Sequence, residues 1–176
     1  MGIFQKEVES LAWIDGSADD PQDLCLHGHV RVQIGQRVLE DDATVSATAL
    51  YLLKTLTEDK RMEPQSIQML PCCGFFMIAN KERTEVEIIG CDNGTDWSVI
   101  HQDGKIRLIL PDGAEETVEM EEYRRQVYRF ADTIEAFYRQ CTPKELPQDP
   151  FDRDGYQAFW KEWHRRRNQG VDTDAQ

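Results

Sequence analysis

The sequence contains no apolar run that approaches the roughly 20 residues needed to span a bilayer. Residues 1–14 include acidic side chains and lack the basic and apolar segments of a secretory signal. Internal repeats and low-complexity linkers are also missing. We therefore expect a soluble cytoplasmic protein with one domain over residues 1–170 and a disordered tail over residues 171–176.

Motifs of common enzymes are missing too. The chain has no Walker A loop, no Gly-x-Gly-x-x-Gly, no His-Glu-x-x-His and no Gly-x-Ser-x-Gly. The segment that begins at Asp92 resembles an EF-hand calcium loop only superficially. It has Trp97 at the sixth position and Asp103 at the twelfth, where that loop needs Gly and Glu. These absences favour a non-enzymatic protein without a metal or other cofactor.

Basic side chains are too few to balance the acidic ones. The chain has 20 Lys and Arg against 33 Asp and Glu, a formal net charge of −13. Residues 1–119 contribute about −12 of this charge, because they hold 10 basic and 22 acidic side chains. Such a surface repels nucleic-acid phosphates and anionic lipids. The charge therefore predicts either a basic protein partner or simply high solubility.

The five cysteines are odd in number and irregularly spaced, which does not suggest a disulfide framework. Neighbouring cysteines rarely bridge each other, and a domain of this size does not need such bridges. We therefore expect buried free thiols in a reducing compartment, at Cys25, Cys72, Cys73, Cys91 and Cys141.

Three turn signals separate four short apolar runs between residues 86 and 118. Asn93-Gly94, Asp103-Gly104 and Asp112-Gly113 are pairs that tolerate the positive φ of tight hairpins. The pattern predicts an antiparallel meander, with strands at Val86–Ile89, Trp97–Ile100, Ile106–Leu110 and Glu116–Val118.

Further elements flank this meander. Apolar side chains occupy the even positions of Leu24–Ile34, which predicts a strand with one buried face. Ile3–Ile14 fits either a strand or a short helix, and Gly74–Ile78 resembles a core strand. A buried helix is expected over Val45–Glu58, preceded by the capping candidates Asp41, Asp42 and Thr44.

Two helices are expected at the carboxyl end. Apolar residues recur every three or four positions over Met120–Cys141, which is typical of a helix packed on a core. The same spacing is compatible with a seam between subunits of a homo-oligomer. The last helix is expected over Arg153–Asn168, with Asp152 as N-cap and Arg165, Arg166 and Arg167 favoured by the helix dipole.

Together these elements predict an α+β fold. We expect an antiparallel meander sheet of five to seven strands, packed by two long helices and a shorter C-terminal helix. The expected order of elements is β-β-α-β-β-β-β-β-α-α.

Cys25, His27 and His29 alternate along the predicted strand and would share one face. Cys72, Cys73 or Cys91 could complete a tetrahedral zinc site with them. Alternatively, one of the paired cysteines could serve as a nucleophile beside His101 and Asp96. The spacing matches no common zinc or nucleophile motif, so this zinc- or thiol-dependent enzyme is kept as an alternative hypothesis.

Binding residues can also be suggested from the pattern. Asp92, Asp96, Asp103 and Asp112 cluster near the predicted turns, where exposure is expected, although Asp is also a common turn former. Trp160 and Trp163 belong to a residue type enriched at interface hot spots. At helical spacing the same residues more often dock a helix onto its own domain.

The segments Leu70-Pro71-Cys72-Cys73-Gly74 and Cys91–Ser98 resemble parts of an uncharacterised bacterial family. As a small acidic α+β chain without a catalytic motif, the protein also resembles bacterial immunity proteins that neutralise polymorphic and contact-dependent toxins. This resemblance implies inhibition by binding, with an acidic surface covering the basic active site of a toxin. It identifies no individual site residue.

Overall fold

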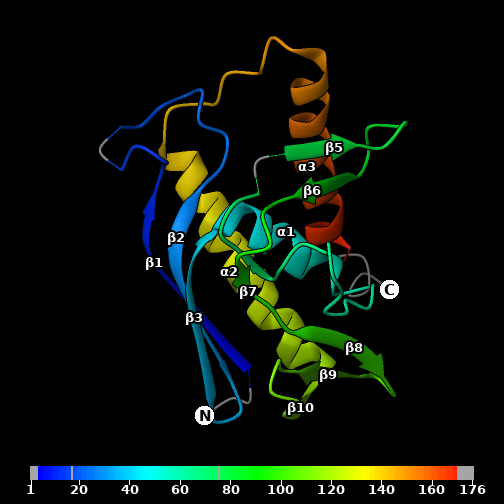
Figure 1. The fold of residues 1–176 in the computed structure, drawn as a ribbon. Coiled ribbons are helices and arrows are strands. Elements are labelled where there is room, and N and C mark those ends of the chain that lie inside the picture. Colours follow the sequence, from blue (N-terminus) through cyan, green and yellow to red (C-terminus); the bar gives the residue numbers. More distant parts are fainter. Residues whose placement is uncertain (1–3, 17, 75, 170–176) are drawn as a thin grey trace.

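The computed structural model describes residues 4–16, 18–74 and 76–169, so the tail expected at 171–176 lies outside the described residues. Its architecture is mixed α+β, as predicted. In the described residues, α-helices and small antiparallel sheets pack around one hydrophobic core (Figure 1).

The amino-terminal sheet has the order β1-β2-β3, with strands Phe4–Ala12, His27–Ile34 and Arg37–Thr44. The ambiguous segment at the amino terminus is therefore a strand. The even positions of β2 are buried, which confirms the predicted alternation. Gly35 has a φ of +59° in the turn between β2 and β3, a conformation that glycine adopts without strain.

The expected single meander is wrong, because its strands belong to separate sheets. Among the described residues, β5 (Phe76–Ala79) pairs with β6 (Val86–Ile89) in a two-stranded sheet, while β8, β9 and β10 form another sheet. Asp103-Gly104 and Gly113 do form its two tight turns. The strands of this sheet are Ser98–Gln102, Lys105–Ile109 and Glu115–Glu119.

The Asn93-Gly94 turn is the point where the meander prediction fails. β7 (Gly94–Thr95) pairs with β4 (Leu70–Pro71), a partner that lies more than 20 residues earlier in the chain. Because the chain after β6 pairs with β4, β6 and β8 do not form a hairpin with each other and belong to different sheets. A Xaa-Gly pair marks a turn, but it does not decide which strand the chain pairs with afterwards.

The helices are α1 (Val45–Lys54), α2 (Met120–Gln140) and α3 (Pro150–Asn168). α1 is shorter than predicted, because the helix ends at Lys54 and the chain continues as turns. Thr44 occupies the N-cap position of α1, but its side chain forms no capping hydrogen bond. α3 begins before the predicted Arg153. Asp149, rather than Asp152, caps it by accepting hydrogen bonds from the backbone N–H groups of Phe151 and Asp152.

The core lies where α1 meets the other two helices. α1 occupies the middle of the molecule, with α2 behind the β1–β3 sheet and α3 behind the β5–β6 hairpin (Figure 1). The apolar stripe of α2 is buried within the chain at Tyr123, Val127, Phe130 and Ile134. The core interpretation is therefore confirmed for the middle of the Met120–Cys141 stripe, while Met120, Phe137 and Cys141 at its ends are only partly buried.

No helix in the described part of the chain has the length and apolar character that crossing a bilayer demands.

Candidate functional site

The four aspartates suggested as a binding surface do not form one patch. Asp92 and Asp103 are exposed, the latter at the end of the β8–β9 hairpin. Asp112 is bound by Arg37 of β3, whose Nε donates to it at 3.0 Å. Asp96 forms an internal ion pair with Lys60 and accepts a hydrogen bond from the backbone N–H of Met69 at 2.9 Å. Asp92, Asp103 and Asp112 are exposed, whereas Asp96 is not open to a partner.

Burial changes the chemistry of Asp96. Its side chain is 16% exposed and that of Lys60 is 11% exposed. Burial raises the pKa of Asp96 and lowers that of Lys60, although each group favours the charged form of the other. This pair is a structural contact that ties residue 60 to the segment before β8.

The two tryptophans belong to the packing of α3. Trp163 is fully buried and its Nε1 donates to Glu135 of α2 at 3.2 Å. Trp160 is half-buried and meets Tyr138 edge-on, with ring centroids 5.0 Å apart. The structure therefore places Trp163 in the core, where it is not available to a partner.

The three arginines at the end of α3 are engaged within the chain. Arg165 pairs with Glu85, and Arg167 pairs with Asp132 and lies over the ring of Tyr128. Arg166 is almost fully buried and pairs with Glu162. Arg166 also pairs with Glu58 and donates to Thr57. These contacts do more than complement the helix dipole, because they attach α3 to α2, to the residue before β6 and to the chain after α1.

Four carboxylates lie on the outer face of the β1–β3 sheet, around one histidine and one arginine. We call this set of six side chains the acidic ladder. It has two cross-strand rows, Glu9–His29–Asp42 and Glu7–Arg31–Glu40. Residues directly opposite each other in a sheet point to the same side, so the four carboxylates enclose one central arginine and one histidine. Glu7, Glu9, Glu40 and Asp42 are all exposed.

The central side chains of the ladder pair with β3. The Nδ1 atom of His29 lies 2.9 Å from Asp42, and Arg31 Nε donates to Glu40 at 2.9 Å. The hydrogen bond with Asp42 raises the pKa of His29. Glu7 and Glu9 form no ion pair with any residue that the structure describes. The two carboxylates on the β1 side of the ladder are therefore not engaged in ion pairs, although Glu9 also helps to raise the pKa of His29.

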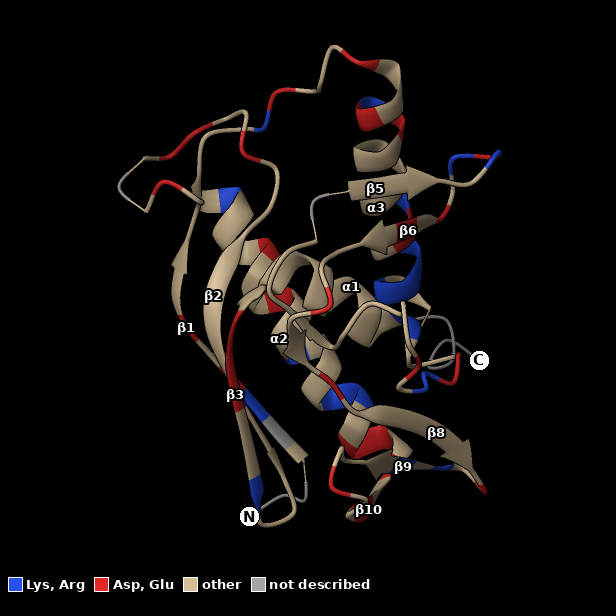
Figure 2. Cartoon of the chain, viewed as in Figure 1, with Lys and Arg blue, Asp and Glu red and all other residues tan. Residues whose placement is uncertain are grey.

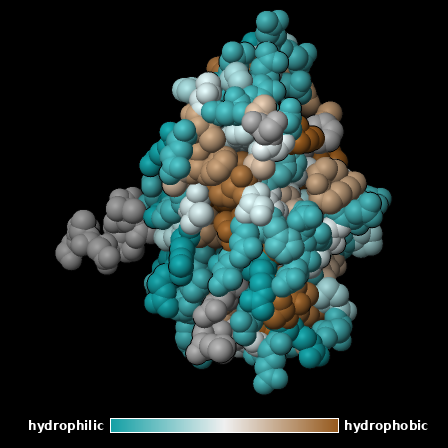
Figure 3. All heavy atoms as spheres, turned by 90° about the vertical axis from the view of Figure 1, so that its left-hand side faces the viewer, coloured by the Kyte–Doolittle hydropathy of each residue, from teal (hydrophilic) through white to brown (hydrophobic). Residues whose placement is uncertain are grey.

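Figure 2 shows acidic residues along β3 and along the loop between β1 and β2. The view of Figure 3, turned to face this side of the molecule, is hydrophilic over most of its area.

The structure does not bring Cys25, His27 and His29 together as the ligands of a zinc site. Cys25 precedes β2 and is buried in the core, where burial raises the pKa of its thiol to about 12. His29 is engaged with Asp42. In the described ranges, the group of His, Cys, Asp or Glu side chains close enough to share a metal ion is a different one, and it consists of Cys72, Cys73 and Cys91.

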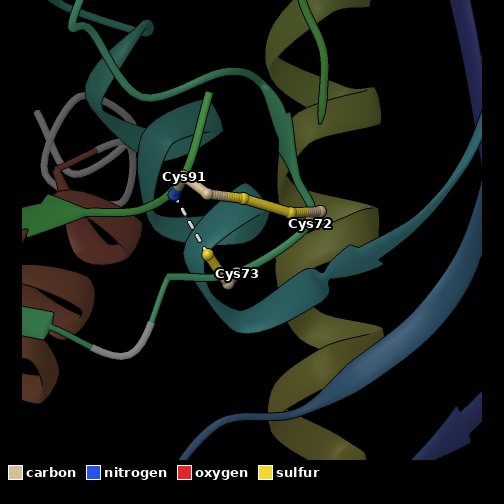
Figure 4. Close-up of side chains that lie close together, drawn as sticks. All are labelled: Cys72, Cys73 and Cys91. Atoms are coloured by element: carbon tan, nitrogen blue, oxygen red, sulfur yellow. Dashed lines mark hydrogen bonds between the residues drawn. A yellow bond between two sulfur atoms is a disulfide. The ribbon is translucent and has the colours of Figure 1, made fainter. Parts of the chain in front are cut away.

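These three residues, which we call the cysteine cluster, lie where the chain after β4 meets the chain after β6 (Figure 4). Cys72 and Cys91 form a disulfide, so the expectation of free thiols is wrong for this pair. Cys73 is a free, partly exposed cysteine, and its Sγ accepts a hydrogen bond from the backbone N–H of Cys91 at 3.0 Å. Cys25 and Cys141 are also free, as expected.

Backbone contacts bring the two segments of the cluster together. The N–H of Cys72 donates to the carbonyl of Asn93 at 3.1 Å, beside the β4–β7 pairing. Gly90 lies against Cys73 so closely that an added Cβ would be 2.1 Å from the Cys73 carbonyl oxygen. A glycine is therefore needed at position 90 for this approach.

A surface pocket of about 170 Å³ opens beside the cluster. Gly90 and Asp92, the two neighbours of Cys91 in the chain, line it together with Tyr51, Lys60 and Glu87. Pockets that bind drug-sized molecules are usually about 300–1,000 Å³. The pocket is therefore too small to indicate a site for an organic cofactor.

Comparisons with protein-family models, with curated proteins and with solved structures find no match to this chain.

The candidate residues were only partly visible in the sequence. The acidic ladder depends on the register between β1, β2 and β3, which places an acidic residue on each side of His29 and of Arg31. Local sequence patterns do not predict this register. The adjacent Cys72 and Cys73 were visible, but their contact with Cys91 depends on the β4–β7 pairing.

Proposed function

We propose that this chain is a non-enzymatic binding protein whose acidic ladder recognises a basic surface on a protein partner. The observation that carries the proposal is the ladder itself. It presents four exposed carboxylates on a three-stranded sheet, and two of them, Glu7 and Glu9, form no ion pair in the described chain. Such a surface suits the inhibition of a basic bacterial toxin by a bound immunity protein.

The distribution of basic side chains supports this proposal. Most described Lys and Arg side chains are used in ion pairs inside the chain, so they do not offset the acidic excess elsewhere. The ion-paired residues include Arg31, Arg37, Lys54, Lys60, Arg83, Lys105, Arg107, Arg124, Arg165, Arg166 and Arg167. The charge left for a partner is negative.

Complementary charge acts mainly on the rate and selectivity of association. An acidic face attracts a basic partner over about 10 Å at 0.1 M salt, and added salt screens this attraction. Binding by the ladder should therefore weaken as the salt concentration rises. The same face should not retain nucleic acids.

The test compares two variants that remove equal charge. The ladder variant carries Glu7→Gln, Glu9→Gln, Glu40→Gln and Asp42→Asn. The control carries four neutralised acids that are exposed elsewhere, namely Glu63→Gln, Glu82→Gln, Glu87→Gln and Glu145→Gln. Each protein is used to isolate partners from cell extract at low and high salt, followed by mass spectrometry and measurement of the association rate.

We expect the wild type and the control variant to retain the same basic protein, with weaker retention at high salt. The ladder variant should associate with it at least about 10-fold more slowly. If the isolated protein is a toxin, one equivalent of the wild type should abolish its activity. Equal retention by both variants, or retention independent of salt, would contradict the proposal.

A further inference from the structure

We infer that the cysteine cluster becomes a three-thiolate site for Zn²⁺ when the disulfide between Cys72 and Cys91 is reduced. Zinc prefers tetrahedral coordination by thiolate sulfur and imidazole nitrogen, with Zn–S bonds of about 2.3 Å. Cys72, Cys73 and Cys91 would supply three of the four ligands. Cys72 lies at the protein surface, so the fourth position is open to water.

The sulfur atoms are already near the required spacing. All three Sγ atoms lie within 4.8 Å of one another. Tetrahedral zinc with bonds of about 2.3 Å separates its sulfur ligands by roughly 3.8 Å. Once the disulfide is cleaved, side-chain rotations can produce this spacing without rearranging the fold, because Cys72 is exposed and the other two cysteines are partly exposed.

The backbone keeps the cluster together without the disulfide. β4 and β7 pair directly before Cys72 and directly after Asn93, and the N–H of Cys72 donates to the Asn93 carbonyl. Gly90 lets its segment approach the carbonyl of Cys73. Reduction therefore leaves the two segments in contact, which lowers the entropic cost of assembling the metal site.

The surroundings favour thiolates that bind a cation. The N–H of Cys91 donates to the Sγ of Cys73 at 3.0 Å, as N–H groups do toward metal-bound thiolates. Asp92 is exposed beside Cys91, and the net charge of −13 attracts cations. The donor set is therefore chemically suited to Zn²⁺.

The redox step needs a dithiol reductant. The dithiol gives two electrons and two protons to the Cys72–Cys91 bond, which yields two cysteine thiols and leaves the reductant as a disulfide. Zn²⁺ then displaces the three thiol protons as it binds. In the oxidised chain only Cys73 of the cluster retains a thiol. The site is therefore available only to the reduced protein.

The experiment titrates the full chain with Zn²⁺ under anaerobic conditions, in competition with a chromogenic chelator. It is done with the oxidised protein and with protein reduced by a dithiol that is then removed. We expect one Zn²⁺ per chain for the reduced form and none for the oxidised form. Co²⁺ in place of Zn²⁺ should give the intense thiolate charge-transfer absorption of a sulfur-rich site.

Variants then test the ligands. Cys73→Ser should lower the Zn²⁺ affinity of the reduced chain by about 100-fold or more. Cys141→Ser is the control, because Cys141 is a free, partly exposed cysteine outside the cluster. Circular dichroism checks that each variant is folded. If Cys73→Ser is not folded, Cys72→Ser replaces it, since Cys72 is exposed.

Equal affinity of the cluster and control variants, equal binding by the oxidised chain, or absence of binding by folded, reduced wild type would each overturn the inference. None of these results depends on the acidic ladder, so the two proposals stand or fail separately.

Discussion

The carboxylate of Glu162 accepts a hydrogen bond from the backbone N–H of Val86 at 2.8 Å, which joins α3 to the first residue of β6. The same fully buried carboxylate lies 3.1 Å from Lys54 Nζ on α1 and 2.7 Å from Arg166 Nε. Lys54 Nζ in turn donates to the Val86 carbonyl at 2.9 Å. One acidic side chain therefore connects two helices and a hairpin.

Removing this carboxylate should be costly. Glu162→Ala removes the buried carboxylate beside both Lys54 and Arg166, and leaves the buried Arg166 guanidinium with only the more exposed Glu58 as a carboxylate partner. We therefore expect the free energy of unfolding to fall by about 3–5 kcal/mol. The measurement is urea-induced unfolding followed by circular dichroism. Lys161→Ala is the control, because Lys161 is exposed, and it should change stability by no more than about 0.5 kcal/mol. A loss below about 1 kcal/mol for Glu162→Ala would contradict this account.

Two aspartates that look alike in the sequence should respond differently to neutralisation. Asp96→Asn weakens a buried contact with Lys60 and Met69, so we expect a loss of about 2–3 kcal/mol in unfolding free energy. Asp112→Asn weakens an exposed pair with Arg37, which should cost no more than about 0.5 kcal/mol. Thermal and urea unfolding of both variants checks this. Equal losses of unfolding free energy in the two variants would contradict the expectation that the buried Asp96 contributes more to stability than the exposed Asp112.

The close approach at Gly90 should not tolerate a methyl group. Gly90→Ala places a Cβ against the Cys73 carbonyl oxygen, so the two segments must separate, and we expect a loss of about 1–3 kcal/mol. Gly16→Ala is the control, because an added Cβ there meets nothing within 4 Å. Unfolding is measured with the disulfide intact and after its reduction. Similar stability of the two variants in both states would refute the close contact.

His29 should titrate above its usual pKa of about 6.5, because its ring bonds to Asp42. A pKa raised by folding stabilises the protein below the unfolded pKa, and this contribution disappears as pH rises through the folded pKa. NMR titration of the imidazole resonances in wild type and Asp42→Asn measures the effect. The variant should show a lower pKa for His29. An unchanged pKa of His29 in the Asp42→Asn variant would mean that Asp42 does not raise it.

Patterns that depend on neighbouring residues could be predicted from the sequence. The alternation in β2, the Asp103-Gly104 turn and the stripe of α2 each follow from the geometry of one strand, one turn or one helix. The sequence alone therefore determined the α+β class, the positions of most elements and the burial of the α2 face. Its acidic charge was likewise visible without a structure.

Contacts between distant segments were decided only by the tertiary structure. The same short apolar strand can pair with several partners, so the division into separate sheets was not encoded in any local pattern. The pairing of β4 with β7 brings Cys91 to Cys72 and Cys73, and the packing of α3 buries Glu162. Polar residues such as Asp96 and Glu162 lie inside because partners compensate their burial, and those partners are far away in the chain.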